Sequence, residues 1–234
     1  TRMVARAEAE GVMLGLHTLS NFVTPNDPLV TPVPAAGLQT VGSATLLQGV
    51  DARSSSILID ANTWFPSARR SHLGAARIGS ELVGFDSVRA VSGGFGLVGV
   101  ERGAFGTSAT PHEAGAAVAR LDDHAYRVFL AGLTESEHMA ERLAGIMRRT
   151  GVRGMGFDGL GGVHTSGHGK YAENRFGTAG WNALGADLQN HSINSASGTT
   201  HWYWHIYSRM NWGEPWRGGF REAQLVRRLR QQDY

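Results

Sequence analysis

Two short apolar runs of this sequence each end in a side chain that could do acid–base chemistry, His17 and Asp158. Alternation along Val152–Asp158 puts Met155 and Phe157 on one face of a β-strand and two glycines with Asp158 on the other. Asp158 then stands at the C-terminal end of the strand, which is where parallel α/β folds bind ligands. We therefore expect a catalytic carboxylate at Asp158. The alternative is an Asp that only caps a turn or the following helix.

A third candidate strand, Thr199–Tyr207, is the most aromatic part of the chain. Alternation puts His205 and Tyr207 on its polar face. The strand runs into a loop that combines aromatic rings with a cation, an amide and an acid. Such a set can stack on the C–H face of a sugar and pair with its hydroxyls. The candidates in this loop are Arg209, Asn211, Trp212 and Glu214. The alternative for Trp212 is packing beneath the last helix.

The residues after the first strand form a proline-rich stretch, Thr18–Pro34, which we expect to be a rigid extended loop. Loops of this kind often shape binding sites. We therefore expect a substrate to contact His17, just before this stretch, and Asn21 and Asp27, inside it.

The flanking segments predict how these residues are positioned. A helix is expected over Arg2–Glu10 and a strand over Val12–His17. An amphipathic helix should run from Thr134 to about Arg149 and lead into the Asp158 strand, and another should cover Tyr171–Leu188. This order of strand, helix and strand implies parallel strands.

Between about Ala35 and Asp122 helical periodicity disappears, and short β-prone runs alternate with turns. The pattern V-x-R-G-x-x-G-T-x-A-x-x-H, running from Val100 to His112, is similar to modules of phage-tail and carbohydrate-associated proteins. We interpret the segment as an inserted β-rich module in which Arg102 and His112 are structural. Glycan binding by the module is the alternative. The expected domains are residues 1–34 and 123–234 as barrel, with 35–122 inserted.

Composition excludes several classes of protein. The 234 residues carry a net charge of +2, too small to indicate a nucleic-acid partner. Cysteine is absent, so neither disulfides nor thiolate chemistry is available. No apolar run is long enough to cross a membrane. The sequence does not identify the cellular compartment, and a periplasmic or secreted location is compatible with it.

No cofactor or metal is expected. The glycine-rich run Gly159–Lys170 lacks the order of a phosphate-binding loop. His164 and His168 have the spacing of metal ligands on a helix, but the surrounding glycines disfavour a helix and no third ligand is evident.

Three runs of the sequence resemble a family of barrel proteins from bacterial polysaccharide-degrading systems, which is similar to glycoside hydrolases of the alpha-galactosidase kind. These runs are LGLHTLSNFVTPNDPLVTPVP, MGFDGLGG and HWYWHIYSRMNWGEPWRGGFREAQ. The resemblance implies Asp158 as nucleophile. Glu214 is the most eligible acid/base, and an acid beyond Tyr234 is the alternative.

The expected fold is α/β, a partial TIM-type barrel of parallel strands with an inserted all-β module. A complete barrel takes about 250 residues, and only three strand–helix repeats are visible here. We therefore expect either a homo-oligomer or a longer chain of which this is a part.

Three functions fit these expectations. The first is a glycosidase acting on a polysaccharide or oligosaccharide through a carboxylate pair. The second is a non-catalytic carbohydrate-binding or scaffold protein with the same aromatic cleft. The third is a polysaccharide lyase that uses Tyr207 or His205 as base near Arg209.

Overall fold

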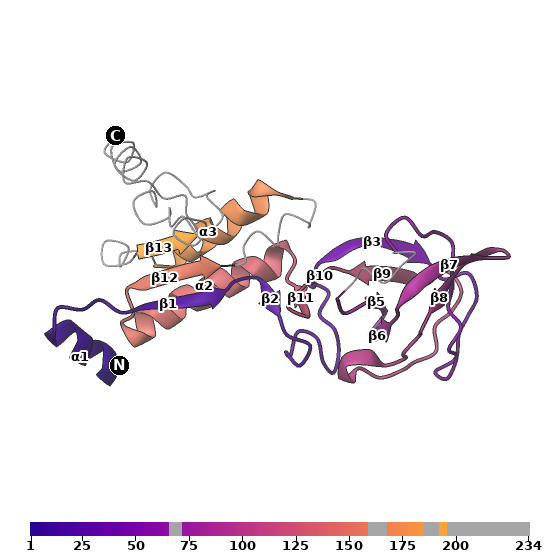
Figure 1. Ribbon diagram of the computed structural model, residues 1–234, viewed down its shortest axis with the longest axis horizontal. Helices are drawn as coiled ribbons and strands as arrows, with labels where there is room; N and C mark the ends of the chain where they lie inside the picture. Colours follow the sequence, from indigo (N-terminus) through magenta and orange to yellow (C-terminus); the bar gives the residue numbers. More distant parts are fainter. Residues whose placement is uncertain (66–71, 159–167, 185–191, 196–234) are drawn as a thin grey trace, which may run out of the picture. The chain divides into compact units, whose positions relative to one another are not determined.

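The computed structural model describes residues 1–65, 72–158, 168–184 and 192–195 (Figure 1). These residues divide into two compact units. One contains residues 1–20 together with the described residues from 137 to 158 and from 170 onward. The other, which we call the β unit, contains Asn21–Ser136 with the described residues 168 and 169, and it is built mainly of β-strands.

The first unit contains a parallel sheet. Its strands are β1 (Gly15–Leu19), β12 (Gly154–Asp158) and β13 (Ser192–Ser195), in the order β1–β12–β13. The helices are α1 (Arg2–Ala9), α2 (Leu133–Thr150) and α3 (Lys170–Leu184). Figure 1 shows the three strands side by side.

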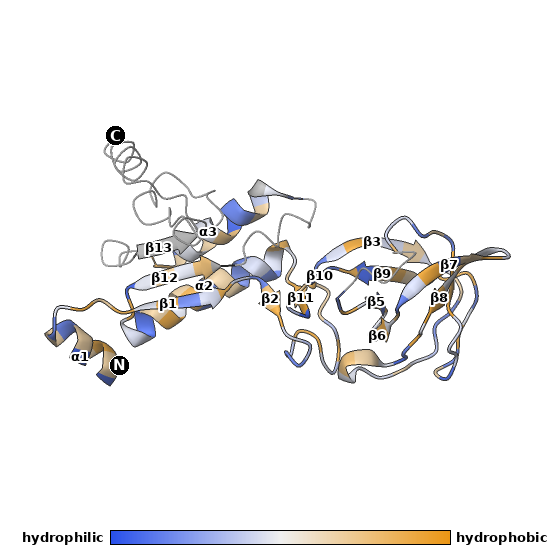
Figure 2. Cartoon of the chain, in the orientation of Figure 1, coloured by the Kyte–Doolittle hydropathy of each residue, from blue (hydrophilic) through white to orange (hydrophobic). Residues whose placement is uncertain are grey.

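Helix α2 forms because its small and apolar residues recur at helical spacing. Ala140, Ala144 and Met147 lie one turn apart on a single stripe, and all three are buried. In Figure 2 the helix carries both hydrophilic and hydrophobic colours, as an amphipathic helix does. Gly151 follows the helix with a φ of 78°, a left-handed conformation that suits a helix end.

The second unit contains three antiparallel sheets of three, four and three strands, in the orders β10–β11–β2, β3–β9–β5–β6 and β4–β8–β7. The strands are β2 (Phe22–Val23), β3 (Thr40–Thr45), β4 (Leu58–Ile59), β5 (Ala75–Ile78), β6 (Glu81–Gly84), β7 (Ser87–Val91), β8 (Gly94–Val98), β9 (Ala117–Leu121), β10 (Asp123–His124) and β11 (Val128–Leu130). A short 3-10 helix, η1 (Ala104–Gly106), precedes β9.

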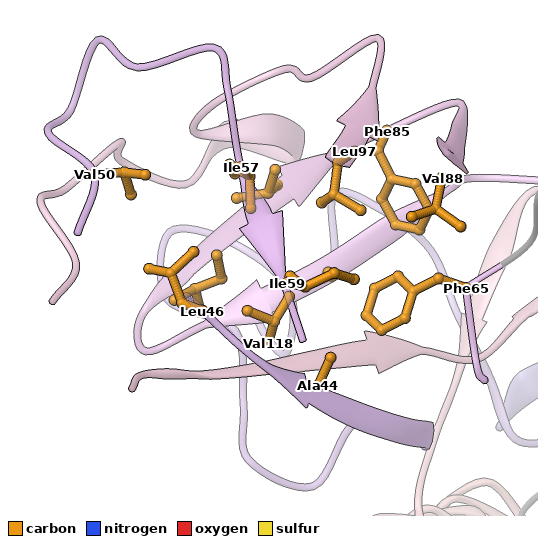
Figure 3. Close-up of a cluster of buried hydrophobic side chains, with 13 residues drawn as sticks. Ala44, Leu46, Val50, Ile57, Ile59, Phe65, Phe85, Val88, Leu97 and Val118 are labelled. Carbon is orange, nitrogen blue, oxygen red and sulfur yellow. The ribbon is translucent and has the colours of Figure 1, made fainter. Parts of the chain in front are cut away.

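The core of this second unit is a cluster of aliphatic and aromatic side chains from different strands (Figure 3). Ile59 of β4, Ile78 of β5 and Val118 of β9 are fully buried in it. Phe65 and Phe85 contribute a tilted ring pair with centroids 5.7 Å apart. Burial of this apolar surface, worth roughly 25 cal/mol per Å², gives residues 44–118 a hydrophobic core of their own.

The expected fold class, a partial TIM-type barrel, is wrong. The described residues are mostly antiparallel β-sheet with three helices, and their one parallel sheet has three strands, with no barrel-like pattern. Alternating apolar residues predict a strand but not the direction of its neighbour, because parallel and antiparallel strands share the same period of two.

Several expected elements occur with shifted ends. The first strand is Gly15–Leu19, three residues later than expected, and the long helix begins at Leu133. The proline-rich stretch is not entirely loop, because it contains β2. The expected strand Thr199–Tyr207 lies outside the described residues.

Candidate functional site

The C-terminal ends of β1 and β12 lie next to each other in the parallel sheet. The register pairs His17 with Gly156 and Leu19 with Asp158. On the other side of β12, Gly156 pairs with Asn194 of β13. Asp158 therefore occupies the last position of the central strand, at the end where parallel sheets present functional groups.

One face of this sheet is closed by helices. Met155 and Phe157 of β12 are each 2% exposed and pack against α2 and α3. Phe157 meets Phe176 of α3 edge to face, with ring centroids 5.0 Å apart and planes at 85°. This geometry is the favourable one for aromatic pairs and fixes the strand against the helix.

The opposite face is open along β1. Gly15, His17 and Leu19 are exposed, and of the alternate positions Leu16 is also exposed and Thr18 is half-buried. A Cβ added at Gly156 would lie 3.1 Å from Nδ1 of His17, so the imidazole rests over the glycine backbone. A Cβ at Gly15 would lie 3.3 Å from the carbonyl oxygen of Gly154. Glycine at these positions lets the two strands and the His17 ring approach closely.

The residues of these strands that can do acid–base chemistry are His17 in β1 and Asp158, the last residue of β12. Asp158 is the sole acidic residue of the three described strands β1, β12 and β13. A carboxylate can act as nucleophile or base, and an imidazole can bind hydroxyls or transfer protons. Catalysis by a pair of carboxylates would need a second acid, and β1, β12 and β13 contain no other.

Asn21 belongs to the β unit and is 1% exposed. Its φ of 67° is left-handed, a conformation that Asn tolerates better than most residues. The hydroxyl of Ser136 donates to its amide oxygen, and the backbone N–H of Ala131 donates to its carbonyl at 3.1 Å. Among the described residues its side-chain N–H groups have no acceptor. Asn21 thus helps to fix the backbone between β1 and β2.

Asp27 also lies in the β unit and is half-buried. Its carboxylate accepts a hydrogen bond of 2.8 Å from the backbone N–H of Leu29, and its carbonyl accepts from Val30 at 2.8 Å. A side chain that bonds the backbone two residues on forms an Asx-turn. Substrate contact by Asn21 and Asp27 stays a prediction.

The remaining expected site residues lie outside the described residues and stay predictions. They are His205, Tyr207, Arg209, Asn211, Trp212 and Glu214, together with the predicted loop histidine His164.

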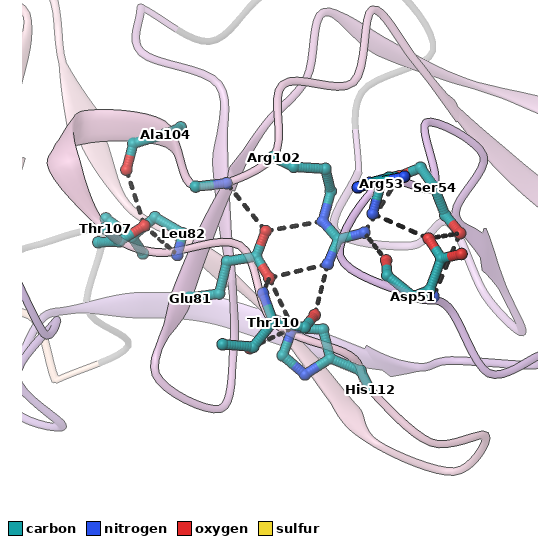
Figure 4. A network of polar contacts seen from close by, with 11 residues as sticks. Asp51, Arg53, Ser54, Glu81, Leu82, Arg102, Ala104, Thr107, Thr110 and His112 are labelled. Atoms are coloured by element: carbon teal, nitrogen blue, oxygen red, sulfur yellow. Dashed lines mark hydrogen bonds and ion pairs between the residues drawn. The ribbon is translucent and has the colours of Figure 1, made fainter.

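Glu81 in β6, which sequence analysis missed, is the centre of a network of polar contacts (Figure 4). Its side chain is fully buried. Arg102 donates to both carboxylate oxygens, at 2.7 and 2.9 Å, and the backbone N–H groups of Gly103 and Thr110 donate at 2.9 and 3.0 Å. Nε2 of His112 lies 2.8 Å from Oε2. The one sequence signal for this site was an acidic residue at the start of an otherwise apolar strand.

We call Glu81 with Arg102, Gly103, Thr110 and His112 the Glu81 network. Its contacts explain why the carboxyl group of Glu81 is ionised. Burial opposes ionisation of Glu81, but the hydrogen bonds from Arg102, Thr110, Gly103 and His112 outweigh it and lower its pKa to about 2. Because an ionised carboxylate only accepts hydrogen bonds, His112 donates from Nε2. Arg102 also donates to the carbonyls of Asp51, Ser54 and Thr110.

The Glu81 network therefore accounts for the motif around Arg102 as a structural feature. It ties β6 to the segment after β8 and to the loop before β9 through the ion pair and the backbone hydrogen bonds of Glu81 and Arg102. Thr107 continues it, accepting from the N–H of Leu82 at 3.0 Å and donating to the carbonyl of Ala104 at 2.9 Å.

The described part of the chain contains no cluster of three or more His, Cys, Asp or Glu side chains able to hold a metal ion. None of its helices has the length and apolarity needed to cross a bilayer.

No protein-family model matches this sequence, and no match to a curated protein was found. The expected description as a TIM-barrel glycoside hydrolase is thus wrong in its fold, since the described residues are predominantly antiparallel, and it has no support from a family match.

Proposed function

We propose that this chain binds a carbohydrate at the C-terminal end of its parallel sheet and that Asp158 is the carboxylate that acts on a glycosidic bond there. The observation that carries the proposal is the position of Asp158, last in the central strand and in register with the end of β1. This edge is the one at which parallel α/β sheets carry their ligands.

The neighbouring strand supports the proposal. His17 is exposed, and it pairs with the residue two positions before Asp158. The glycines opposite it leave backbone rather than side chains on its face of the sheet, which gives a ring-shaped ligand room to approach. The period of two predicts that Asp158 shares this face with His17.

The carbohydrate class is supported by the sequence. The aromatic run after Thr199 and the loop with Arg209, Trp212 and Glu214 combine stacking faces with groups that pair with hydroxyls. Hydrolysis by two carboxylates makes Glu214 the partner of Asp158 in this proposal.

A second function is favoured by one observation. Asp158 is the sole acid in the three described strands of the parallel sheet, and hydrolysis of glycosides uses a pair. A protein that binds glycans at this sheet without turnover has no need of the second acid.

The test uses the full chain with a panel of aryl glycosides and short oligosaccharides, and it measures turnover and binding separately. We expect Asp158→Asn to lose turnover by at least about a thousandfold while keeping its affinity, since the amide is isosteric but not nucleophilic. Asp60→Asn is the matched control, because Asp60 is an exposed acid whose carboxylate accepts from the N–H of Thr45.

Two results decide between the candidates. Turnover that survives in Asp158→Asn removes Asp158 from the reaction. Glycan affinity without turnover in the unaltered chain supports the binding function instead.

A further inference from the structure

An aromatic cluster lies on the antiparallel sheet β10–β11–β2 of the β unit. It consists of Phe22 of β2, His124 of β10 and Tyr126 in the turn that joins β10 to β11. The ring centroids are 4.8 Å apart for Phe22 and His124, 4.9 Å for His124 and Tyr126, and 5.9 Å for Phe22 and Tyr126. All three distances fall within the range of favourable aromatic contacts.

The three rings have different roles in this cluster. Phe22 and His124 are half-buried and lie with their planes at 32° to each other. Tyr126 stands nearly perpendicular to both, at 80° and 77°, and it is 64% exposed. The first two rings therefore contact the Tyr126 ring, and most of the Tyr126 side chain stays exposed to solvent.

The turn that presents Tyr126 is tightly defined. The backbone N–H of Arg127 donates to the carbonyl of His124 at 2.8 Å, and Arg127 has a left-handed φ of 57°. A residue with a Cβ is uncommon in this conformation, and glycine is the usual choice at such a turn position. The left-handed conformation of Arg127 marks this turn as an unusual one for a residue with a side chain.

Polar groups lie on the same short turn as the exposed ring. The backbone N–H of Tyr126 donates to Nδ1 of His124 at 3.3 Å, so in the neutral ring the proton is on Nε2. Within the described residues, His124 Nε2, the Tyr126 hydroxyl and the Arg127 guanidinium make no hydrogen bond or ion pair. An exposed tyrosine is thus combined with an imidazole N–H and a phenol hydroxyl on one short turn.

We propose that this cluster is a carbohydrate-binding site in which a sugar ring stacks on Tyr126. A pyranose offers a C–H face to the aromatic ring and hydroxyls to His124 and to the phenol, which matches the mixed character of the cluster. Three rings are too few for a stable protein interface, which buries about 800 Å² on each partner. A sugar needs no larger surface, and the site does not depend on Asp158.

The test is isothermal titration of the full chain with short xylo-, manno- and alginate oligosaccharides. We expect at least one of them to bind, and Tyr126→Ala to weaken that binding about tenfold, which corresponds to about 1.4 kcal/mol. Tyr126→Phe, which keeps the face, should retain most of the affinity. Tyr171→Ala is the matched control, since Tyr171 of α3 is also an exposed tyrosine, at 53%, and lies outside the cluster.

The proposal is overturned if none of the three ligands binds, or if Tyr126→Ala binds as tightly as the unaltered chain. Circular dichroism of Tyr126→Ala establishes that the variant is folded. Failure here is distinguishable from failure of the proposed function. Tyr126→Ala should keep turnover of a small aryl glycoside, and Asp158→Asn should keep the affinity that depends on Tyr126.

Discussion

The imidazole of His17 lies over the backbone of Gly156, its direct partner on the neighbouring parallel strand, where an added Cβ would come within 3.1 Å of Nδ1. This relationship gives Gly156 a role that its place in the strand alone does not explain. The glycine sets the height of the imidazole above the sheet, two positions before Asp158.

Replacing Gly156 with Ala should displace His17 by a few tenths of an ångström and leave the fold in place. Because His17 is exposed and its ring can shift, we expect the free energy of unfolding to change by less than about 1 kcal/mol. The measurement is the NMR chemical shifts of the His17 ring, together with turnover. Gly96→Ala is the control, since its Cβ would meet only Val91, at 3.7 Å. Unchanged His17 resonances in Gly156→Ala would contradict the close approach.

Glu81→Gln should destabilise the β unit strongly. The substitution leaves Arg102 with a neutral partner in a buried site, and breaking such a pair typically costs about 3–5 kcal/mol. Denaturant unfolding at neutral pH measures the effect, and Glu113→Gln, at an exposed position, serves as the control. A loss no larger than in Glu113→Gln would show that the Glu81 network is not stabilising.

The same carboxylate predicts how stability depends on pH. The folded-state pKa of Glu81 is about 2, below its ordinary value of 4.5, so the unfolded state binds the proton more readily. The stabilisation is therefore present above about pH 4.5 and is lost as the pH falls toward 2, by on the order of 3 kcal/mol. Unfolding free energies measured across this interval should show the loss in the unaltered chain. In Glu81→Gln the dependence should be clearly flatter, and equal slopes in the two proteins would refute the assignment.

Substitutions at two glycines of the β unit allow the cost of backbone strain to be measured separately from the cost of a steric clash. Gly103 and Gly115 both have left-handed φ values, 60° and 88°. A Cβ at Gly103 would lie 2.9 Å from both Thr107 O and Ala109 N, whereas a Cβ at Gly115 would meet nothing within 4 Å. Gly115→Ala should cost about 1–2 kcal/mol from its conformation alone. Gly103→Ala should cost about 1–3 kcal/mol more, and equal losses in denaturant unfolding would contradict the clash.

The contact between Phe157 and Phe176 should be measurable as a coupling. Phe157→Ala removes a ring that is 2% exposed between the sheet and two helices, so we expect a loss of about 3–5 kcal/mol. A double-mutant cycle with Phe176→Ala should give a coupling of about 0.5–1.5 kcal/mol beyond the loss of buried area. Additive losses would mean that the edge-to-face pair contributes no specific interaction.

The sequence by itself determined the local elements wherever a short-range pattern was enough. The alternation that assigned Met155 and Phe157 to the covered face of β12 is observed, because period two in a strand leaves no other arrangement. The helical spacing of Met139, Leu143 and Met147, with Ala140 and Ala144 beside them, likewise predicted the packed side of α2. In the structure Ala140, Ala144 and Met147 are buried there, and Met139 and Leu143 are half-buried. The inserted stretch was also expected to be rich in β-structure, and it contains most of the strands.

Tertiary structure alone decided how these elements pair and which polar groups meet. The partners of Glu81 are 21 and 31 residues away at Arg102 and His112, and nothing in the local sequence around Glu81 encodes their approach. The sequence pattern likewise did not predict that antiparallel sheets predominate, because the pattern of a strand does not indicate the direction of its neighbour. His17 and Asp158 became neighbours in one sheet only through the pairing of strands more than a hundred residues apart in the chain. Such pairings depend on the free energy of the whole packed unit, and short-range periodicity contains only a part of it.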